Sequence, residues 1–287
     1  MSKIGLVLEG GGLRSAYTAG VLSWFIDHEI DFDFVVGISS GALLAAPFVI
    51  RDKKVLHQLA IEYAGKKENI GFTSIMREGT IVGYNYLVDE IINKKLQLSA
   101  EAVRNAPTPF EMGIYDLFDS KTFWMSSKEL DDKWKFIQAA CTLPIAGRAV
   151  WINKRRYLDA GITSMIPIKR SLKHGCEKHV VISTKTKDFI RKPNSFGMQL
   201  LLDLIYIRYP KMRREFRERT AVYYKEKGQV EALAAQKKAI FIRPSKDLGV
   251  KRFSGDTEQL QRLYELAYQD MDNQKDMIYS FMEKKQQ

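Results

Sequence analysis

A serine at the centre of a glycine-flanked pentapeptide is the strongest candidate for chemistry in this chain. Ser39 lies in GISSG, residues 37–41, between the apolar run FDFVV and the helix-like run ALLAAPFVI. Gly37 and Gly41 permit a sharp turn from strand to helix in which a Cβ atom would clash. A serine held on such an elbow faces the positive end of the following helix, which stabilises an alkoxide. The pattern therefore predicts that Ser39 is a nucleophile.

A serine nucleophile needs a base, and histidine is the usual one. The chain contains four, which are His28, His57, His174 and His179. Three of them end predicted helices or begin a predicted strand, so they should lie at the edge of the sheet opposite Ser39, and the fourth falls on a predicted helix surface. The order Ser39, Asp159, then His174 or His179 nevertheless matches the chain order of an α/β-hydrolase triad. An esterase with a Ser-Asp-His triad is therefore kept as an alternative.

Asp159 is the better candidate base. It lies in RRYLDAGIT, after a strand-like segment and before a turn of small residues. An aspartate before Ala-Gly is, taken alone, more often a turn or capping residue. Considered together with Ser39, it indicates a carboxylate that accepts the serine proton. A carboxylate with the ordinary pKa of about 3.9 is a weak base, so this role requires a partly desolvated site.

Three consecutive glycines in EGGGLRS, residues 9–15, separate a predicted strand from a predicted helix. Such a turn binds an anion, because glycines let the backbone come close and a helix N-terminus offers unpaired N–H groups. The anion is either a nucleotide phosphate or the oxyanion of a reaction intermediate. A dinucleotide fingerprint would have Gly at position 15 and an acidic residue after the second strand, and a P-loop would contain Gly-Lys-Ser/Thr. The sequence has Ser15 and GISSG at those places, which favours an oxyanion beside Ser39.

The elements that must position these residues follow the grammar of a parallel sheet covered by helices. Strand, glycine turn, helix, strand, tight turn and helix succeed one another over residues 3–50. Functional sites in such sheets lie at the carboxyl ends of the strands. Further strands are predicted at 110–117, 121–127, 179–185 and 237–245, a hairpin at 149–161, and helices at 128–144, 195–230 and 256–287.

Taken together, these segments resemble the patatin-like phospholipase family, which comprises lipid acyl hydrolases with a Ser-Asp dyad. The resemblance rests on EGGGLRSAYTAG (9–20), GISSGA (37–42), AACTLPIAG (139–147) and YLDAGITSMIPI (157–168). They occur in the family's order and spacing over residues 4 to about 184. The resemblance implies a three-layer α/β/α fold with a mainly parallel central sheet. It also implies phospholipids, lysophospholipids or related acyl esters as substrates, and neither a metal nor an organic cofactor.

The same resemblance assigns roles to individual residues. The family's nucleophile falls on Ser39 and its aspartate on Asp159, so that these two are the expected catalytic residues. N–H groups of the glycine loop are expected to stabilise the oxyanion. The remaining motif positions are Gly10, Gly11 and Gly12 in the oxyanion loop, Arg14 as a loop- or substrate-positioning residue, and Ala160 and Gly161 after the aspartate. Ser15 and Ala160 replace family glycines, and because both are small we expect activity to survive.

Composition and the absence of apolar targeting segments indicate the class of protein and its cellular compartment. The 287 residues are 45% hydrophobic and 28% charged, which is ordinary for a folded protein with one large domain or one domain and an appendage. The first residues do not resemble a cleavable signal, and no apolar run approaches the ~18 to 20 residues that span a membrane. Cys141 and Cys176 have no metal-ligand spacing, and we expect them to be reduced. A cytoplasmic location is therefore expected.

The net charge of +11 belongs to one segment, because residues 185–252 contain 18 Lys/Arg and 7 Asp/Glu. We therefore divide the chain into an acyl hydrolase core at 4–184 and a mostly helical, basic C-terminal region at 185–287. Such a patch attracts phosphate surfaces, so peripheral contact with the anionic inner membrane face is expected; a solvated helix face is the alternative. The residues expected to meet phosphates are Arg208, Lys211, Arg213, Arg214, Arg217 and Arg219.

Nucleic acid is not expected as a partner, since the basic segment contains no recognised reading motif. A second class of function nevertheless stays open. In it the C-terminal region is the working part of a membrane- or nucleic-acid-associating module, and the dyad is vestigial. The sequence gives no indication of an oligomeric state.

Overall fold

Eight strands form one mixed sheet in the computed structural model, which describes residues 2–66 and 68–283. Five central strands, in the order β3-β2-β1-β7-β8, are parallel, and β4, β5 and β6 join them by antiparallel pairing at the β3 end. The described strands are β1 (Ile4–Leu8), β2 (Phe34–Gly37), β3 (Phe110–Asp116), β4 (Lys121–Ser126), β5 (Val150–Ile152), β6 (Arg155–Asp159), β7 (Lys178–Ile182) and β8 (Ala239–Ile242).

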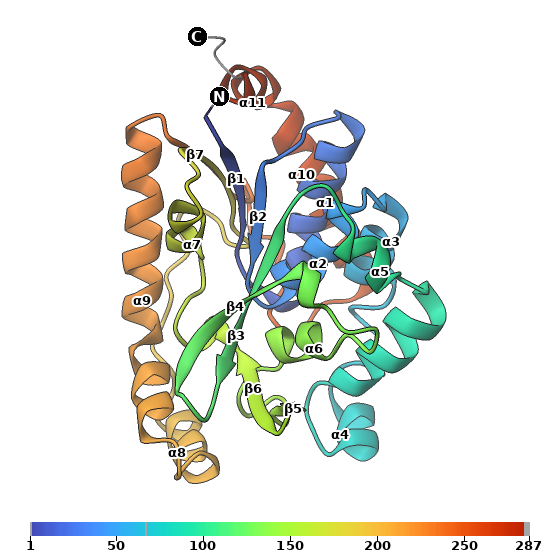
Figure 1. Cartoon of the computed structure of the whole chain (residues 1–287), viewed down its shortest axis with the longest axis vertical. Coiled ribbons are helices and arrows are strands. Elements are labelled where there is room, and N and C mark those ends of the chain that lie inside the picture. Colours follow the sequence, from blue (N-terminus) through green and yellow to red (C-terminus); the bar gives the residue numbers. More distant parts are fainter. Residues whose placement is uncertain (1, 67, 284–287) are drawn as a thin grey trace.

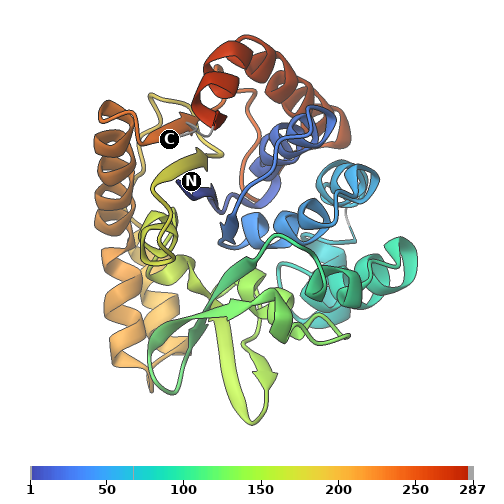
Figure 2. The same ribbon diagram turned by 45° about the horizontal axis from the view of Figure 1, so that its top comes forward.

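Helices cover both faces of this sheet. In both views, α8 and α9 lie on one side and α1 and α10 on the other (Figures 1 and 2). The described helices are α1 (Ser15–Asp27), α2 (Ser40–Val49), α3 (Lys53–His57), α4 (Phe72–Glu78), α5 (Ala100–Arg104), α6 (Lys135–Cys141), α7 (Ile168–Lys173), α8 (Phe196–Ile205), α9 (Pro210–Ala235), α10 (Thr257–Asp272) and α11 (Lys275–Met282). Shorter 3-10 turns are η1 (Gly12–Arg14), η4 (Ser127–Glu129) and η5 (Ala160–Ile162), and the π-helical segments are η2 (Gln58–Glu62) and η3 (Tyr86–Leu96). The predicted three-layer α/β/α fold is confirmed.

The apolar run of β1 explains why this strand lies in the middle of the sheet. All five of its residues are buried, and successive side chains point to opposite faces. Leu6 and Leu8 belong to the core shared with α1, α2 and α10, whereas Val7 packs in a separate core with Tyr223 and Val230 of α9. A central parallel strand must be apolar on both faces, which is why its sequence is continuous rather than alternating.

The C-terminal region contributes to every layer. Its strand β8 pairs in parallel with β7, α9 packs on β8 and α7, and α10 packs on α1. The division at residue 184 stays a prediction, and the last four residues of the C-terminal region, 284–287, lie outside the described residues. No helix in the described part of the chain combines the length and apolarity needed to cross a bilayer.

One predicted helix is much shorter than expected. The stretch 128–144 contains the end of η4 and, as its α-helix, α6 alone, because the Asp131 side chain accepts hydrogen bonds from the N–H groups of Lys133, Lys135 and Phe136. These bonds fix a local turn in front of the helix, and Trp134 takes a left-handed conformation there. The chain therefore enters α6 only at Lys135.

Candidate active site

Ser39 lies on a strained turn between β2 and α2. Its φ of 56° and ψ of −129° are sparsely populated for a residue with a side chain, a strain of roughly 1 to 3 kcal/mol that the surrounding structure must hold. The flanking glycines make the turn sterically feasible. A Cβ atom on Gly37 would lie 2.6 Å from the Ala42 nitrogen, and one on Gly41 would lie 2.7 Å from the Leu8 carbonyl oxygen. The sequence around Ser39 is thus shaped to present its hydroxyl at the start of α2.

Asp159 ends β6, and the sheet register brings it toward Ser39. On β3, Gly37 pairs with Met112 and Asp159 pairs with Ile114, two residues further along the strand. Two residues correspond to about 7 Å along a strand. Ser39 and Asp159 consequently line one small cavity, although 120 residues separate them in the chain.

The Asp159 carboxyl group is fully buried and only half satisfied. Its Oδ1 accepts a hydrogen bond of 2.6 Å from the Gly161 N–H, while its Oδ2 has no hydrogen-bond partner among the described residues. Burial raises the pKa of Asp159; the Gly161 N–H, the Ser39 hydroxyl and the charges of Arg219 and Arg252 oppose this rise. Ser39 is thus close enough to stabilise the carboxylate without meeting the geometry of a full hydrogen bond. The free Oδ2 is available to take a proton.

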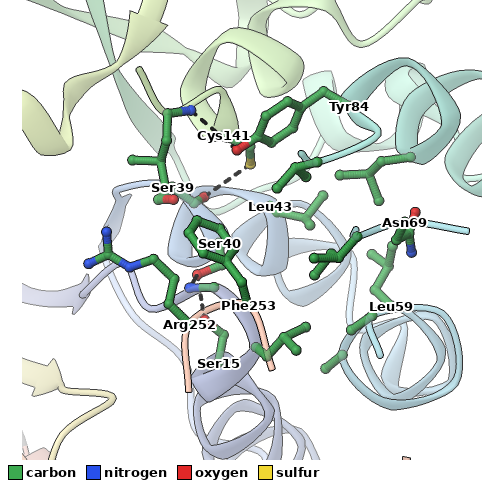
Figure 3. A pocket seen from close by; sticks show the side chains of 18 of the residues that line it. Ser15, Ser39, Ser40, Leu43, Leu59, Asn69, Tyr84, Cys141, Arg252 and Phe253 are labelled. Atoms are coloured by element: carbon green, nitrogen blue, oxygen red, sulfur yellow. Dashed lines mark hydrogen bonds between the residues drawn. The ribbon is translucent and has the colours of Figure 1, made fainter. Parts of the chain in front are cut away.

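The glycine loop is engaged by the residue after Ser39. The N–H groups of Gly11 and Gly12 donate to Ser40 Oγ at 2.9 and 3.0 Å, and the Ser15 and Ser40 hydroxyls hydrogen bond to each other. Figure 3 shows this cluster beside Ser39. The predicted role of these N–H groups towards a substrate carbonyl stays a prediction, and in the structure both donate to a protein side chain.

Two cavities meet at Ser39. The larger, with a volume of about 120 Å³, is mainly apolar. The smaller is lined by Ser39, Asp159 and four cationic side chains. Both cavities are lined by Gly12, Ser39, Leu143 and Arg252. In Figure 3 the Arg252 side chain points to the side of Ser39 opposite Leu59. The apolar side chains of the larger cavity come from η1, α2, η2, η3 and the segment between η2 and η3, and include Leu13, Leu43, Leu44, Leu59, Ile70, Val82 and Leu87.

The cationic side chains of the smaller cavity are Lys185, Arg191, Arg219 and Arg252. Lys185 pairs with Glu9, and both side chains are buried. Burial lowers the pKa of Lys185 to about 8, and Glu9 opposes this change. The three arginines have no carboxylate partner within 4.0 Å in the described part of the chain. A pocket with unpaired cations therefore adjoins the candidate nucleophile.

The remaining motif residues support the two loops. Arg14 lines neither cavity at Ser39; its Nε donates to the Val250 carbonyl at 3.1 Å, which ties the glycine loop to the segment that carries Arg252. Gly10 approaches Ser39 closely, because a Cβ there would lie 2.8 Å from the Ser39 Cβ. Ala160 and Gly161 form η5, the turn that supplies the N–H donor to Asp159.

No described histidine lines either cavity at Ser39. His174 stacks on Phe34 at the beginning of β2, with ring centroids 3.8 Å apart, and His179 is buried against the Ser171 hydroxyl. Burial lowers the pKa of His179 to about 4. Because Ser39 follows the opposite end of β2, this arrangement matches the expected separation between these histidines and the nucleophile.

Several residues of the site escaped the sequence analysis. Cys141, considered a structural thiol, donates its Sγ hydrogen to the Ser39 carbonyl at 3.4 Å, and Tyr84 accepts from the Leu143 N–H in the same cavity (Figure 3). Burial raises the pKa of Cys141, so its thiol is not activated. Arg219 was expected to meet lipid phosphates at the surface, but it is 5% exposed and lines the same cavity as Ser39 and Asp159. Its only sequence signal is its place on the buried stripe of α9.

Two family models match this chain. The model described as patatin-like phospholipase matches residues 6–171, more than half of the chain. The chain belongs to the patatin-like phospholipase family. Family membership supports lipid acyl hydrolysis as the class of reaction. A second model, a domain of unknown function (DUF6363), matches residues 209–283 of this patatin-like chain.

Two similar proteins place the chain further. The uncharacterized protein YjjU of Escherichia coli (strain K12) is 29% identical over 210 residues, which cover 68% of this chain and 55% of YjjU. The chain thus matches little more than half of that relative. The crystal structure of VipD from Legionella pneumophila superimposes with a TM-score of 0.50 and 13% identity over 95% of this chain and 67% of VipD. This likeness concerns the fold alone and agrees with the patatin-like architecture.

Proposed function

We propose that this patatin-like protein is a serine lipid acyl hydrolase in which Ser39 and Asp159 form the catalytic dyad. Its substrates would be carboxylic esters of phospholipids, lysophospholipids or related acyl lipids. The observation that carries this proposal is the pairing of a strained, glycine-flanked serine with a buried carboxylate whose Oδ2 is free. A buried carboxylate without a full set of partners destabilises a fold, so its presence beside a strained serine indicates function.

In the proposed reaction, Ser39 Oγ attacks the acyl carbonyl and its proton passes to Asp159. The ester C–O bond then breaks, and the leaving alcohol takes the proton from Asp159. Water next gives a proton to Asp159 and attacks the acyl-enzyme, after which the fatty acid leaves and Ser39 regains its proton. Burial assists Asp159, because its raised pKa makes it a better base than an exposed aspartate.

The oxyanion would be held by the N–H groups of Gly11 and Gly12 after Ser40 has rotated away. Loss of one such donor typically costs about 2.7 to 4 kcal/mol of barrier lowering. Acyl chains would occupy the apolar cavity, because its lining is mainly apolar and a hydrocarbon chain displaces few hydrogen-bonded groups there. Arg14 would act indirectly, by fixing the glycine loop against Val250.

Two alternatives are less well supported. A triad would need a histidine in the cavity, and none lines it among the described residues. A module with a vestigial dyad does not explain why Asp159 is buried in one cavity with Ser39 while its Oδ2 lacks a partner among the described residues, because such burial is unfavourable for folding.

The dyad is tested with Ser39→Ala and Asp159→Asn in a p-nitrophenyl ester assay. Both variants should lower turnover to near background, because one lacks the nucleophile and the other keeps the shape of the base without its basicity. His174→Ala is the matched control and should keep turnover within a few-fold of wild type. Thermal unfolding confirms that each variant is folded. Full activity in Ser39→Ala, or loss of activity in His174→Ala equal to that in Asp159→Asn, would overturn the dyad.

We further propose that the protein works at an anionic membrane surface from the cytoplasmic side. Helix α8 exposes a nearly continuous apolar face, and α4 exposes another at the same end of the molecule (Figure 1). Basic side chains of α9 lie beside α8, two of them bound to Asp203. The exposed apolar residues are Phe196, Met198, Leu200, Leu201, Leu204 and Ile205 on α8 and Phe72, Ile75 and Met76 on α4. Apolar patches of this kind on a folded protein mark interaction sites.

A further inference from the structure

The three unpaired arginines beside the dyad form a site that the dyad chemistry does not require. Arg219 is 5% exposed, and its Nε is buried without a hydrogen-bond partner among the described residues. The Nε of Arg191 is likewise buried and unpartnered. Arg252 lines the same cavity and makes no ion pair with a described residue. Burying a guanidinium is unfavourable unless a counter-charge is present at least part of the time.

These arginines arrive from three separate segments, each fixed by other contacts. Arg219 lies on α9, which is anchored by Glu226: that carboxylate accepts from the Ser164 hydroxyl and from the N–H groups of Met165 and Ile166 at 2.7 to 2.9 Å. Arg191 lies on the segment after β7, and its own backbone N–H donates to the Tyr224 hydroxyl of α9 at 2.9 Å. The site is thus held in place from outside the cavity.

Arg252 is fixed by the glycine loop itself. Its carbonyl accepts from the Leu13 N–H at 3.1 Å, and a Cβ on Gly12 would lie 2.4 Å from that carbonyl. Gly12 has a φ of +61°, which also favours glycine. The last glycine of the loop is therefore needed for the approach of Arg252, independently of any N–H donor to the oxyanion.

The charges in and around this cavity are unbalanced. Lys185 and the three arginines contribute four positive charges, against one negative charge each on Glu9 and Asp159. The surplus of two positive charges matches a phosphate monoester, which carries about −1.5 to −2 at neutral pH. Burial lowers the pKa of Arg219; the charges of Arg252 and Arg191 lower it further, and the charge of Asp159 opposes this change. Guanidinium groups bind phosphate oxygens in pairs, which gives both strength and orientation.

We propose that Arg191, Arg219 and Arg252 bind the phosphate of the substrate, and that the enzyme prefers acyl esters whose alcohol carries a phosphate monoester. This inference rests on the proposed function. An acyl chain in the apolar cavity places its ester at Ser39, and the alcohol side then enters the arginine cavity. All three arginines lie outside the matched patatin-like segment, and Arg219 and Arg252 belong to the segment that matches the domain of unknown function. The C-terminal region would thus supply the substrate specificity of the catalytic core.

The cavity volume of about 20 Å³ is close to that needed for one water molecule, so a phosphate enters only when side chains move. Arg191 and Arg252 are partly exposed and lie outside helices and strands; their backbones are held by the contacts above, so the movement is one of their side chains, whereas Arg219 is buried on α9. Arg219 is accordingly the anchor of the site, and the other two arginines close on the phosphate from the solvent side.

The test compares three esters with the same octanoyl chain: octanoylglycerol 3-phosphate, octanoylglycerol phosphocholine and octanoylglycerol, all as monomers in solution. We expect kcat/KM to be highest for the phosphate monoester and lowest for the neutral ester. Arg219→Gln should lower the ratio of monoester to neutral ester by at least tenfold, equal to about 1.4 kcal/mol. The ratio is the readout because Arg219 also stabilises the Asp159 carboxylate, an effect that both substrates share.

Arg262→Gln is the matched control, since Arg262 is an exposed arginine of α10, outside the cavity lining, that pairs with Glu258. Its ratio should equal that of wild type. If Arg219→Gln does not fold, Arg191→Gln and Arg252→Gln on the two loops provide the same test. Inorganic phosphate should inhibit hydrolysis of the neutral ester competitively in wild type and much less in the arginine variants.

Equal kcat/KM for the monoester and the neutral ester in wild type would overturn the inference, as would an unchanged ratio in all three arginine variants. Inhibition by inorganic phosphate without a preference for the phosphate ester would also overturn it, because the site would then serve a free anion. Failure of the proposed function looks different: wild type would cleave none of the three esters and no p-nitrophenyl ester.

Discussion

Ser40→Ala should make the enzyme faster and less stable at the same time. In the structure, the Ser40 hydroxyl accepts hydrogen bonds from the N–H groups of Gly11 and Gly12, the donors proposed for the oxyanion. The substrate must therefore displace this side chain before the transition state is stabilised. Alanine leaves the N–H groups bound to water, which an oxyanion displaces more readily.

The size of the effect follows from the two hydrogen bonds. A neutral hydrogen bond in a protein contributes about 0.5 to 1.5 kcal/mol more than its exchange with water, so the pair contributes about 1 to 3 kcal/mol. Because kcat/KM compares the free enzyme with the transition state, removing the Ser40 hydroxyl as a competing acceptor raises kcat/KM by an upper limit that lies between about fivefold and 150-fold. The same free energy is lost from folding, and at about 2 to 4 °C per kcal/mol for domains of 150 to 250 residues the melting temperature should fall by about 2 to 12 °C.

The assay is the kcat/KM of a short-chain p-nitrophenyl ester together with the melting temperature. Ser15→Ala is the matched control, because it removes the other hydroxyl of the cluster but leaves the acceptor of both N–H groups in place. It should lower stability with a smaller gain in kcat/KM than Ser40→Ala. A tenfold or greater loss of kcat/KM in folded Ser40→Ala would refute the reasoning and show that the hydroxyl supports the loop during catalysis.

Two further predictions concern the base and the membrane. Because burial raises the pKa of Asp159, the acid limb of the kcat/KM profile should have an apparent pKa above about 3.9, since activity is lost as the pH falls through the raised value; a limb at or below 3.9 would contradict this. For the membrane, Phe196→Ser with Leu204→Ser should weaken co-sedimentation with anionic vesicles at least tenfold, as these side chains are 84% and 64% exposed and each is worth up to about 1.5 to 3 kcal/mol when fully buried. Hydrolysis of a soluble ester should stay intact, and Met277→Ser on α11, 49% exposed and at the opposite end of the molecule in Figure 1, should bind vesicles as wild type does. If the α8 double variant and Met277→Ser lost vesicle binding equally, the apolar face of α8 would not be a membrane contact.

Features that depend on neighbouring residues were predictable from the sequence. The elbow at Ser39 and the turn after Asp159 each depend on five to nine consecutive residues. Each strand of the parallel core is a short apolar run that ends at a glycine or a polar residue. The order of these elements then implied the layers, because parallel strands require covered faces. The shortened α6 was missed for a local reason as well, since a single aspartate competes with the helix for three backbone N–H groups.

The environment of the dyad was not predictable in the same way. The contact between Ser40 and the glycine loop joins residues 28 and 29 positions apart, and it depends on the direction of one side chain. The basic region was recognised from its charge, but charge alone does not separate side chains that face lipid from those that face the protein. Arg213 and Arg217 contact Asp203 at the surface, whereas Arg219, on the same helix, is buried next to Asp159.

Helix α9 nevertheless carries a signal in its spacing that distinguishes these arginines. Its buried residues recur at intervals of three and four and are Met212, Phe216, Arg219, Tyr223, Glu226 and Val230. Four are apolar or aromatic, as the inner face of a helix requires, and two are charged. Glu226 is explained by its three hydrogen bonds to residues 164–166, which fix the helix to the segment after the catalytic motif. Arg219 lies two turns away on the same face, about 10.5 Å along the axis. Its guanidinium lies over the Phe216 ring of the same helix, but no comparable set of hydrogen bonds to described residues explains its burial. Arg219 is held on a buried stripe by a neighbouring anchor and lines the same cavity as Asp159 without forming an ion pair with it, which is the arrangement that the proposed phosphate site requires.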